Sequence, residues 1–573
     1  MRRTLLTLLL ATVPAAVGAQ GAPSERQPLP IDVRREIVSR WNSRSATALV
    51  ATDQLQIAEG HEVRGDVLVR NGPLVIAGHV IGNVLAVNSN VTLMPTARIE
   101  GDVLVIGGEL SGRTSARVTG ATRIYRQDFL LREDGERIAD AEADATTDEA
   151  WWRRFDRRRD GNWSEALRIV QAGAYNRVEG LPVQVGPVLQ GRTPWGSLHF
   201  DGAVVVRTAT SFNAQRGDAG YRLRGEVRFG DTKAIGVGGA AFSVVEPVED
   251  WQLSNLETAL AAFVMRHDYR DYYQRHGGQA FVTLYGARNL SWTASYGEAR
   301  WSTRDAKKPL TIFDNGKEWR PNPAVDEGLF HIAGTRLSFD TRTDPTDPWS
   351  GWYLNADIER GHGALSQIAP TSATRTLAAG SKTDYTRGFF DFRRYNRLGP
   401  KAQLNMRVAL GGWLGGDPLP LERRVSVDGP GVLPGFDFRS GRTTPNVGTC
   451  NTASGNAVAG RPTECERMAL AQIEYRGDLR LDVLNIWSDW PRHYHSAHGD
   501  AAWVVFADAG RGWLVGQSDG SLTYTDDAFP PVSTFRTDLG LGLDFGGVGI
   551  YVAKALSTSA EPVNFFLRLR HRF

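Results

Sequence analysis

Cys450 and Cys465 are the two residues of this chain whose type and spacing most directly suggest chemistry. They are the only cysteines in 573 residues, and they flank a stretch rich in Gly, Asn, Ala and Pro. In an oxidising compartment, such a pair is more typical of one closed loop than of a metal site or a nucleophile. The sequence therefore predicts a local disulfide.

Other reactive side chains lack the spacing that catalysis would need. One stretch contains four potential metal ligands, His267, Asp268, Asp271 and His276. Their spacing matches no metal-ligand family, and helical periodicity over residues 253–273 favours packing of an external-loop helix. Histidines at 493, 495 and 498 leave a pH-sensitive or metal-binding role open. With no Gly-x-Ser-x-Gly elbow and no phosphate loop, the sequence predicts no enzymatic activity, cofactor or metal.

The N-terminus predicts export. Arg2 and Arg3 precede the apolar run 5–13, and Val17-Gly18-Ala19 has the small residues that a signal peptidase reads, so residues 1–19 are predicted as a signal peptide. No cysteine follows to carry a lipid anchor. No other stretch approaches the roughly 18 to 20 apolar residues of a membrane helix. If the chain spans a membrane, it does so with strands.

The C-terminal residues have the pattern of such a strand. On one face they place Phe565, Leu567, Leu569 and Phe573, and on the other three arginines. This alternation fits a barrel wall between lipid and a polar lumen, although a half-buried edge strand would show it too. The net charge of +2 gives no sign of a nucleic-acid partner.

Residues 166–573 alternate in the same way over about sixteen predicted strands. Leu404, Met406 and Val408, for example, oppose Asn405 and Arg407. Charges at every second position suit a wet lumen and not a dry core.

The connections between these strands sort by length. Short gaps fall on one rim, at 192–195, 231–233, 288–289, 396–400 and 546–547. Long ones fall on the other, at 247–277, 302–329, 362–383, 415–467 and 512–534, and only 477–499 breaks the rule. Short periplasmic turns and long external loops are typical of outer-membrane barrels. The predicted fold class is all-β, a 16-stranded antiparallel transmembrane β-barrel preceded by a short β-helix.

The β-helix prediction comes from a repeat. Gly-Asp/Asn-Val-Leu recurs at residues 65, 82 and 101, with a weaker copy at 120. A period of 17 to 19 residues suits one rung of a β-solenoid, so residues 47–126 are predicted to form one. The pattern resembles the bactofilin family of polymer-forming β-helix proteins. A solenoid that serves only as a spacer is the alternative.

Two further segments complete the predicted organisation. Residues 20–46 form an N-terminal segment without an assigned fold. Residues 127–165 are charged on both sides of Trp151-Trp152 and are predicted to be a linker or a helix, with a membrane-interface position as a second interpretation.

The barrel resembles the BamA/TamA-type outer-membrane assembly proteins, also called bacterial surface antigens. The segment from Asp340 to Gly351, with Arg342, Pro345 and Pro348, is similar to that family's periplasmic turn, and Phe506 to Gly510 is similar to its Asp-Ala-Gly strand. The resemblance covers most of the last 250 residues. The family's periplasmic α/β domains are absent from the sequence before residue 166, and the predicted solenoid takes their place.

The segment 427–436 resembles the family's lumen loop, which ends in Arg-Gly-Phe or Arg-Gly-Tyr. The matching residues are Gly429, Leu433, Pro434, Gly435 and Phe436. By resemblance, the loop arginine pairs with acidic residues of the inner wall, here Glu474 and Asp508. Pro434 replaces that arginine. We therefore expect Arg439, or else Arg423, to supply the missing charge, with hydration of the carboxylates as the alternative.

The resemblance implies a barrel in the outer membrane, with the β-helix in the periplasm, that inserts or translocates other polypeptides. Its expected partners are outer-membrane lipid and other outer-membrane or exported polypeptides. An envelope scaffold, with self-association through the β-helix, is a second interpretation. A passive pore is a third.

Overall fold

The computed structural model describes residues 29–573 with gaps. The residues outside the description are 1–28, 30, 46, 53, 127–128, 130, 135–136, 141–162, 194, 210–218, 231–232, 287–289, 314–317, 343–347, 349, 374, 376, 400–401, 440–444, 453–457, 480–500, 517–521 and 546–547. The predicted signal peptide, Trp151-Trp152, Pro345 and the histidines at 493–498 lie among them. No helix in the described ranges is long and apolar enough to cross a membrane.

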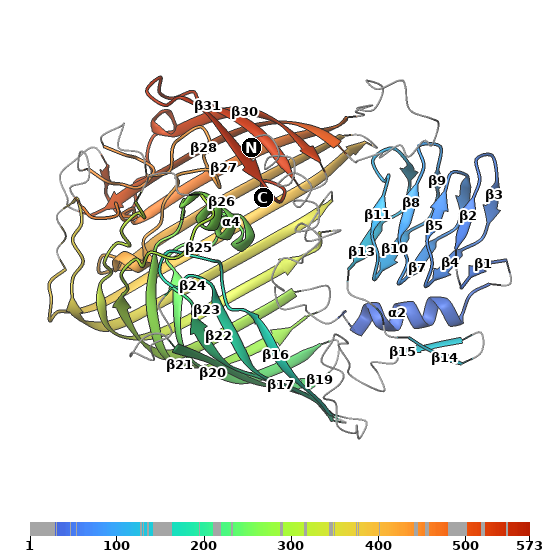
Figure 1. The fold of residues 1–573 in the computed structure, drawn as a ribbon, viewed down its shortest axis with the longest axis horizontal. Helices are drawn as coiled ribbons and strands as arrows, with labels where there is room; N and C mark the ends of the chain where they lie inside the picture. Colours follow the sequence, from blue (N-terminus) through green and yellow to red (C-terminus); the bar gives the residue numbers. More distant parts are fainter. Residues whose placement is uncertain are drawn as a thin grey trace, which may run out of the picture.

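The N-terminal part is a parallel β-solenoid, as the repeat predicts (Figure 1). Three parallel sheets form its sides, in the orders β1-β4-β7-β10-β13, β11-β8-β5-β2 and β12-β9-β6-β3. The strand bounds are β1 Leu49–Ala51, β2 Leu55–Ile57, β3 Glu62–Arg64, β4 Val67–Arg70, β5 Leu74–Ile76, β6 His79–Ile81, β7 Val84–Val87, β8 Val91–Leu93, β9 Arg98–Ile99, β10 Val103–Ile106, β11 Leu110–Ser111, β12 Arg117–Val118 and β13 Thr122–Tyr125.

The repeated motif has a direct structural reason. A Cβ added at Gly82 would lie 2.3 Å from the carbonyl oxygen of Gly65, and one at Gly101 would lie 2.4 Å from that of Gly82, so the rungs stack too closely for a side chain. The next residue forms a ladder: Asn83 N donates to Asp66 Oδ1 (2.7 Å), and Asp102 N donates to Asn83 Oδ1 (3.0 Å). Fully buried valines follow and fill the solenoid core.

Helix α2, Ile31–Asn42, covers one side of the solenoid. Val33, Ile37 and Trp41 are buried against Leu68, Leu85 and Leu104. Arg123 donates from Nη1 to Glu36 Oε2 (2.8 Å) and fixes the helix to the last rung. The segment 20–46 therefore contains a helix that sequence reasoning left unassigned.

The charged segment 127–165 differs from the expected linker or helix in the part that is described. It contains an antiparallel hairpin, β14 Leu131–Asp134 and β15 Arg137–Asp140. The first barrel strand begins at Trp163, three residues before the predicted boundary.

Sixteen antiparallel strands then form one large sheet, and a two-residue strand, β29, adds to it by parallel pairing with β28. The sixteen are β16 Trp163–Gln171, β17 Pro182–Thr193, β18 Gly196–Arg207, β19 Ala219–Gly230, β20 Ala234–Pro247, β21 Tyr272–Tyr285, β22 Leu290–Thr303, β23 Glu327–Asp340, β24 Gly351–Gln367, β25 Lys382–Gly399, β26 Ala402–Gly416, β27 Arg467–Leu479, β28 Ala501–Val515, β30 Arg536–Phe545, β31 Gly549–Ala555 and β32 Val563–Arg568; β29 is Thr523–Tyr524.

The predicted alternation is present in the wall. On β26 the side chains of Met406, Val408 and Leu410 are exposed, whereas Asn405 and Arg407 are buried in the interior. The sheet therefore has an apolar outside and a charged inside, which defines a transmembrane β-barrel. The predicted fold class is confirmed.

The connections segregate as predicted. The strand bounds leave short connections, 194–195, 231–233, 286–289, 400–401 and 546–548, on one rim and long connections, 248–271, 304–326, 368–381, 417–466 and 516–535, on the other. The solenoid sits at the short-turn rim, where Arg397 Nη2 at the end of β25 donates to the carbonyl oxygen of Arg113 (3.0 Å).

Three short helical elements lie in the long loops. Helix α4, Asn255–Met265, is in the loop after β20, within the predicted helical stretch. The 3-10 turns η2, Leu421–Arg423, and η3, Val532–Thr534, follow β26 and β29.

Candidate functional site

The loop 417–466 folds into the barrel and packs against the inner wall. Val427, Leu433 and Phe436 are buried there in an apolar cluster with wall residues such as Leu470. Gly435 N donates to Asp538 Oδ2 on β30 (2.7 Å). A Cβ at Gly435 would lie 2.6 Å from Asp538 Cβ and 2.8 Å from the backbone nitrogen of Ala555, so only glycine permits this approach.

The rest of the loop motif makes complementary contacts. The carbonyl oxygen of Pro434 accepts from Asn564 Nδ2 on β32 (3.2 Å), and that of Val432 accepts from Gln472 Nε2 on β27 (2.9 Å). Gly429 adopts φ 85°, in the left-handed region that favours glycine. The segment 427–436 thus connects the wall strands near the end of the chain.

Arg439 does not compensate for the missing loop arginine. Its Nη2 donates to Asp271 Oδ2 (2.9 Å) in the loop after β20, away from Glu474 and Asp508. The prediction is wrong because Asp271 belongs to a second buried ion cluster, in which Arg177 Nη2 also contacts it at 3.0 Å. Two residues of the stretch 267–276, Asp268 and Asp271, are therefore buried ion-pair partners of Arg177.

Arg423, the second candidate, is also occupied elsewhere. Its Nε donates to Glu359 Oε1 on β24 (2.7 Å), and its Nη1 donates to the hydroxyl of Tyr273 (2.8 Å). It anchors the start of the lumen loop to the inner side of β24 and β21.

The cation beside the inner-wall carboxylates comes from the end of the chain. Arg572 Nη2 forms an ion pair and hydrogen bond with Asp508, and its Nη1 lies 3.9 Å from Glu474 Oε2. The guanidinium also lies 3.5 Å from the ring centroid of Phe506. Arg476 donates to Glu474 from the neighbouring position on the same face (3.2 Å). Both carboxylates are therefore paired, and the alternative of hydration alone is wrong.

This arrangement changes the predicted last strand. Phe565 and Leu567 face outward and are exposed, as predicted, but β32 ends at Arg568. Residues 569–573 leave the wall and enter the lumen, where Phe573 is buried with its ring 6.4 Å from that of Tyr395. Leu569 and Phe573 are therefore not lipid-facing residues of a terminal strand. The ion pairs of the arginines favour the inward turn.

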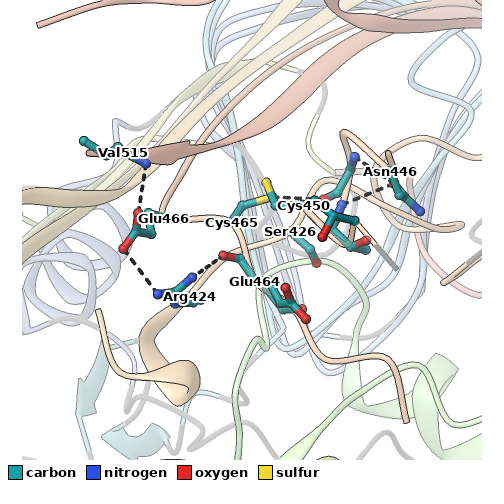
Figure 2. The surroundings of a disulfide bond; sticks show 12 residues. Arg424, Ser426, Asn446, Cys450, Glu464, Cys465, Glu466 and Val515 are labelled. Carbon is teal, nitrogen blue, oxygen red and sulfur yellow. Dashed lines mark hydrogen bonds and ion pairs between the residues drawn. A yellow bond between two sulfur atoms is a disulfide. The ribbon is translucent and has the colours of Figure 1, made fainter. Parts of the chain in front are cut away.

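The disulfide between Cys450 and Cys465 is confirmed (Figure 2). The bridge lies within the second half of the loop 417–466, and Val425 N donates to the carbonyl oxygen of Cys465 (2.9 Å), which brings the two ends of the loop together. Arg424 Nη1 donates to the carbonyl oxygen of Glu464 (2.7 Å), and Glu466 Oε2 accepts from Val515 N (2.8 Å). Together these contacts attach the loop to β28.

The predicted periplasmic turn lies on the short-turn rim, between β23 and β24. Asp340 Oδ1 accepts from Arg342 N (3.0 Å), and Oδ2 accepts from its Nη2 (2.7 Å). Gly351 adopts φ 119°, and the carbonyl oxygen of Pro348 accepts from Gln403 Nε2 (2.7 Å). These contacts fix the described residues at the two ends of the segment.

The first and last strands share no backbone pairing among the described residues. β16 pairs with β17, and β32 pairs with β31. β32 has six residues, whereas β24 has 17. The sheet therefore has a seam with two free strand edges.

Comparison with known proteins gives limited similarity. No family model matches the chain. The anti-sigma-W factor RsiW of Halalkalibacterium halodurans is 36% identical over 77 residues, which are 12% of this chain and 36% of that protein. The chain thus spans about a third of this curated relative, and the match transfers no activity.

Two solved structures are similar to the barrel region. BamA from Haemophilus ducreyi lacking POTRA domains 1-3 is 12% identical, with 71% of this chain and 69% of that chain covered and a TM-score of 0.41. CdiB from Acinetobacter baumannii is 10% identical, with 71% and 64% covered and a TM-score of 0.28. At these scores, the fold assignment rests on the strand pairing described above. The BamA/TamA and bactofilin resemblances stay predictions.

Proposed function

We propose that this protein inserts or translocates other polypeptides at the outer membrane, and that an incoming strand pairs with a free edge at the seam. The observation that carries the proposal is the missing pairing between β16 and β32. An unpaired strand edge presents a row of N–H and C=O groups that another chain can use. The proposal assigns no enzymatic activity to the chain.

The orientation follows the loop lengths. The short-turn rim is assigned to the periplasm, which places the solenoid beside the barrel on the side from which exported polypeptides arrive. The long loops then face the cell exterior.

The filled lumen disfavours the passive-pore interpretation. The loop 417–466 buries apolar residues inside the barrel and is attached to the wall by hydrogen bonds such as those of Gly435 with Asp538 and of Glu466 with Val515. We expect low conductance of the purified barrel in a planar bilayer, and a larger conductance when residues 425–440 are deleted. Equal conductance of the two proteins would contradict a plugging role.

Depletion of the protein in its native host tests the proposal. Loss of other barrel proteins from the outer membrane, measured by quantitative proteomics, is the expected result. Normal outer-membrane composition after depletion would contradict it.

A second candidate function is an envelope scaffold. Arg113 at the last rung contacts the barrel, whereas β1, β2 and β3 of the first rung pair only with the second rung among the described residues. This free end fits stacking with a second copy or with a periplasmic partner, as in bactofilin-like polymers. Altered cell shape with normal outer-membrane protein content after depletion would favour it.

A further inference from the structure

Helix α4 bridges the two sides of the seam. Near its N-terminal end, Glu257 Oε1 accepts from Arg568 Nε (2.6 Å) and from Leu569 N (3.1 Å), at the end of β32. Near its C-terminal end, the ring of Phe263 packs edge-on against Tyr175, in the turn after β16, with centroids 5.1 Å apart. In Figure 1 the helix lies between β16 and the red strands that end the chain.

The helix exposes two leucines and buries a polar face, which is the reverse of what a helix surrounded by water would do. Glu257, Thr258 and Ala262 are buried, whereas Leu256 is 38% exposed and Leu260 is 39% exposed, one helical turn apart. Leucines at this spacing form an apolar stripe, and such a stripe normally faces an apolar environment.

The surfaces on either side of this stripe are those of the lipid-facing wall. Leu167 and Ile169 are exposed on β16, and Phe565 and Leu567 are exposed on β32. Because α4 contacts segments that continue both strands, its exposed leucines lie in the opening between two apolar strand surfaces. No other described strand pairs with either edge there.

A helix can occupy such a place because it satisfies its own backbone. Lipid offers no hydrogen bonds, so an irregular loop facing it would leave N–H and C=O groups unpaired. Ser254 begins α4 with a capping box: its Oγ accepts from Glu257 N (3.3 Å), and Glu257 Oε2 accepts from Ser254 N (3.1 Å). Arg266 ends the helix in the left-handed conformation at φ 56°.

We propose that α4 seals the seam and that its Leu256–Leu260 stripe contacts the acyl chains of membrane lipids between β16 and β32. The inference does not depend on polypeptide insertion; an incoming strand would displace α4 to reach a free edge. It assigns the closure of the barrel to a helix that lies in a loop, in place of strand pairing.

Site-directed spin labelling of the full chain in phosphatidylcholine vesicles tests this proposal. The native cysteines are joined in the disulfide, so Leu260→Cys introduces a single reactive thiol. Phe565→Cys is the matched lipid-facing control, and Arg224→Cys, on the inner face of β19, is the lumen control. Folding of each variant is checked by its migration on unheated electrophoresis gels.

We expect the spin label at position 260 to collide with oxygen, which partitions into lipid. We also expect it to be protected from a water-soluble nickel chelate, as the label at position 565 should be. Two outcomes would overturn the proposal: nickel accessibility like that at position 224, or protection from both reagents. A label at position 256 repeats the measurement if Leu260→Cys fails to fold. If depletion left the outer-membrane composition normal, the proposed function would fail, but the spin-label result would still test the position of α4.

Discussion

At the residue scale, a carboxylate buried inside the barrel needs a cation nearby, because removing one partner of a buried pair leaves the other charge poorly solvated. Asp508 and Glu474 are both buried and share Arg572. The penultimate residue of the chain thus supplies a charge at the place where the resemblance expected an arginine of the loop.

We predict that Arg572→Ala destabilises the barrel by about 3–5 kcal/mol because Asp508 loses its cation. The measurement is the temperature at which the compact band on unheated gels converts to the unfolded band. Arg570→Ala is the matched control, since the Arg570 side chain is exposed. Equal conversion temperatures for the two variants would contradict the assigned pairing.

We predict that Gly435→Ala weakens attachment of the lumen loop, at a cost of about 1–3 kcal/mol, because the new methyl group would collide with β30 and β31. Protease cleavage within residues 417–466 should then become faster. Gly415→Ala is the control, because a Cβ there meets no atom within 4 Å. Unchanged cleavage in Gly435→Ala would mean that the loop does not depend on this contact.

The identity of these acidic residues could be predicted from the sequence, but their partner could not. The motif at 427–436 and the inner-wall residues Glu474 and Asp508 were predicted from the resemblance to the family. The choice of Arg439 was wrong because nearness in sequence says nothing about which wall a loop residue reaches. The alternation at the end of the chain, which was expected to point the arginines at 568, 570 and 572 inward, is the sequence signal that could have indicated the partner.

At the element scale, the disulfide closes a loop of 15 residues. We predict that the double variant Cys450→Ser/Cys465→Ser loses about 3 kcal/mol of stability, because the unfolded loop regains conformational freedom. The test compares the conversion temperatures of the wild type and the variant on unheated gels. The wild type treated with reductant should match the variant, and a variant as stable as the oxidised protein would contradict the prediction.

Helix α2 should respond to acid through Glu36. Burial acts to raise the pKa of Glu36, but its hydrogen bond with Arg123 and the charges of Arg123 and Arg40 outweigh burial and lower the pKa. A lowered folded-state pKa gives stability at neutral pH, and this stability is lost as the pH falls through that pKa, below about 4.5.

We predict that Glu36→Gln lowers the unfolding temperature of the solenoid at pH 7 and has a smaller effect at pH 3, because protonation of Glu36 weakens its ion pairs as the pH falls. Scanning calorimetry of the wild type and the variant at both pH values measures the difference. The exposed Glu59→Gln serves as the control. A difference of the same size at both pH values would show that the charge of Glu36 does not matter.

The solenoid could be predicted because its rungs repeat the same close glycine contact and the same Asp/Asn ladder every 17 to 19 residues. Helix α2 could not, since its role comes from packing onto rungs that lie far along the chain. The hairpin at 131–140 was missed because its charged strands lack an apolar face. Tertiary contact, not local pattern, decides such elements.

At the scale of the whole molecule, the barrel was predictable because two independent patterns, alternation and loop length, agree over sixteen strands. The closure of the barrel was not, because the pairing of the first and last strands depends on shear and strand length across the entire sheet. Nothing in the local sequence of β16 marks it as an unpaired edge.

The proposed function requires a seam that accepts other polypeptides. A photoreactive amino acid placed at Leu167 on β16 in the native host, with irradiation during growth, tests this most directly. Leu337 on β23, an outward residue of a fully paired strand, is the control position. We predict covalent adducts with other outer-membrane or exported polypeptides at position 167 and few at position 337; polypeptide adducts that are absent from 167, or no more frequent there than at 337, would contradict the account.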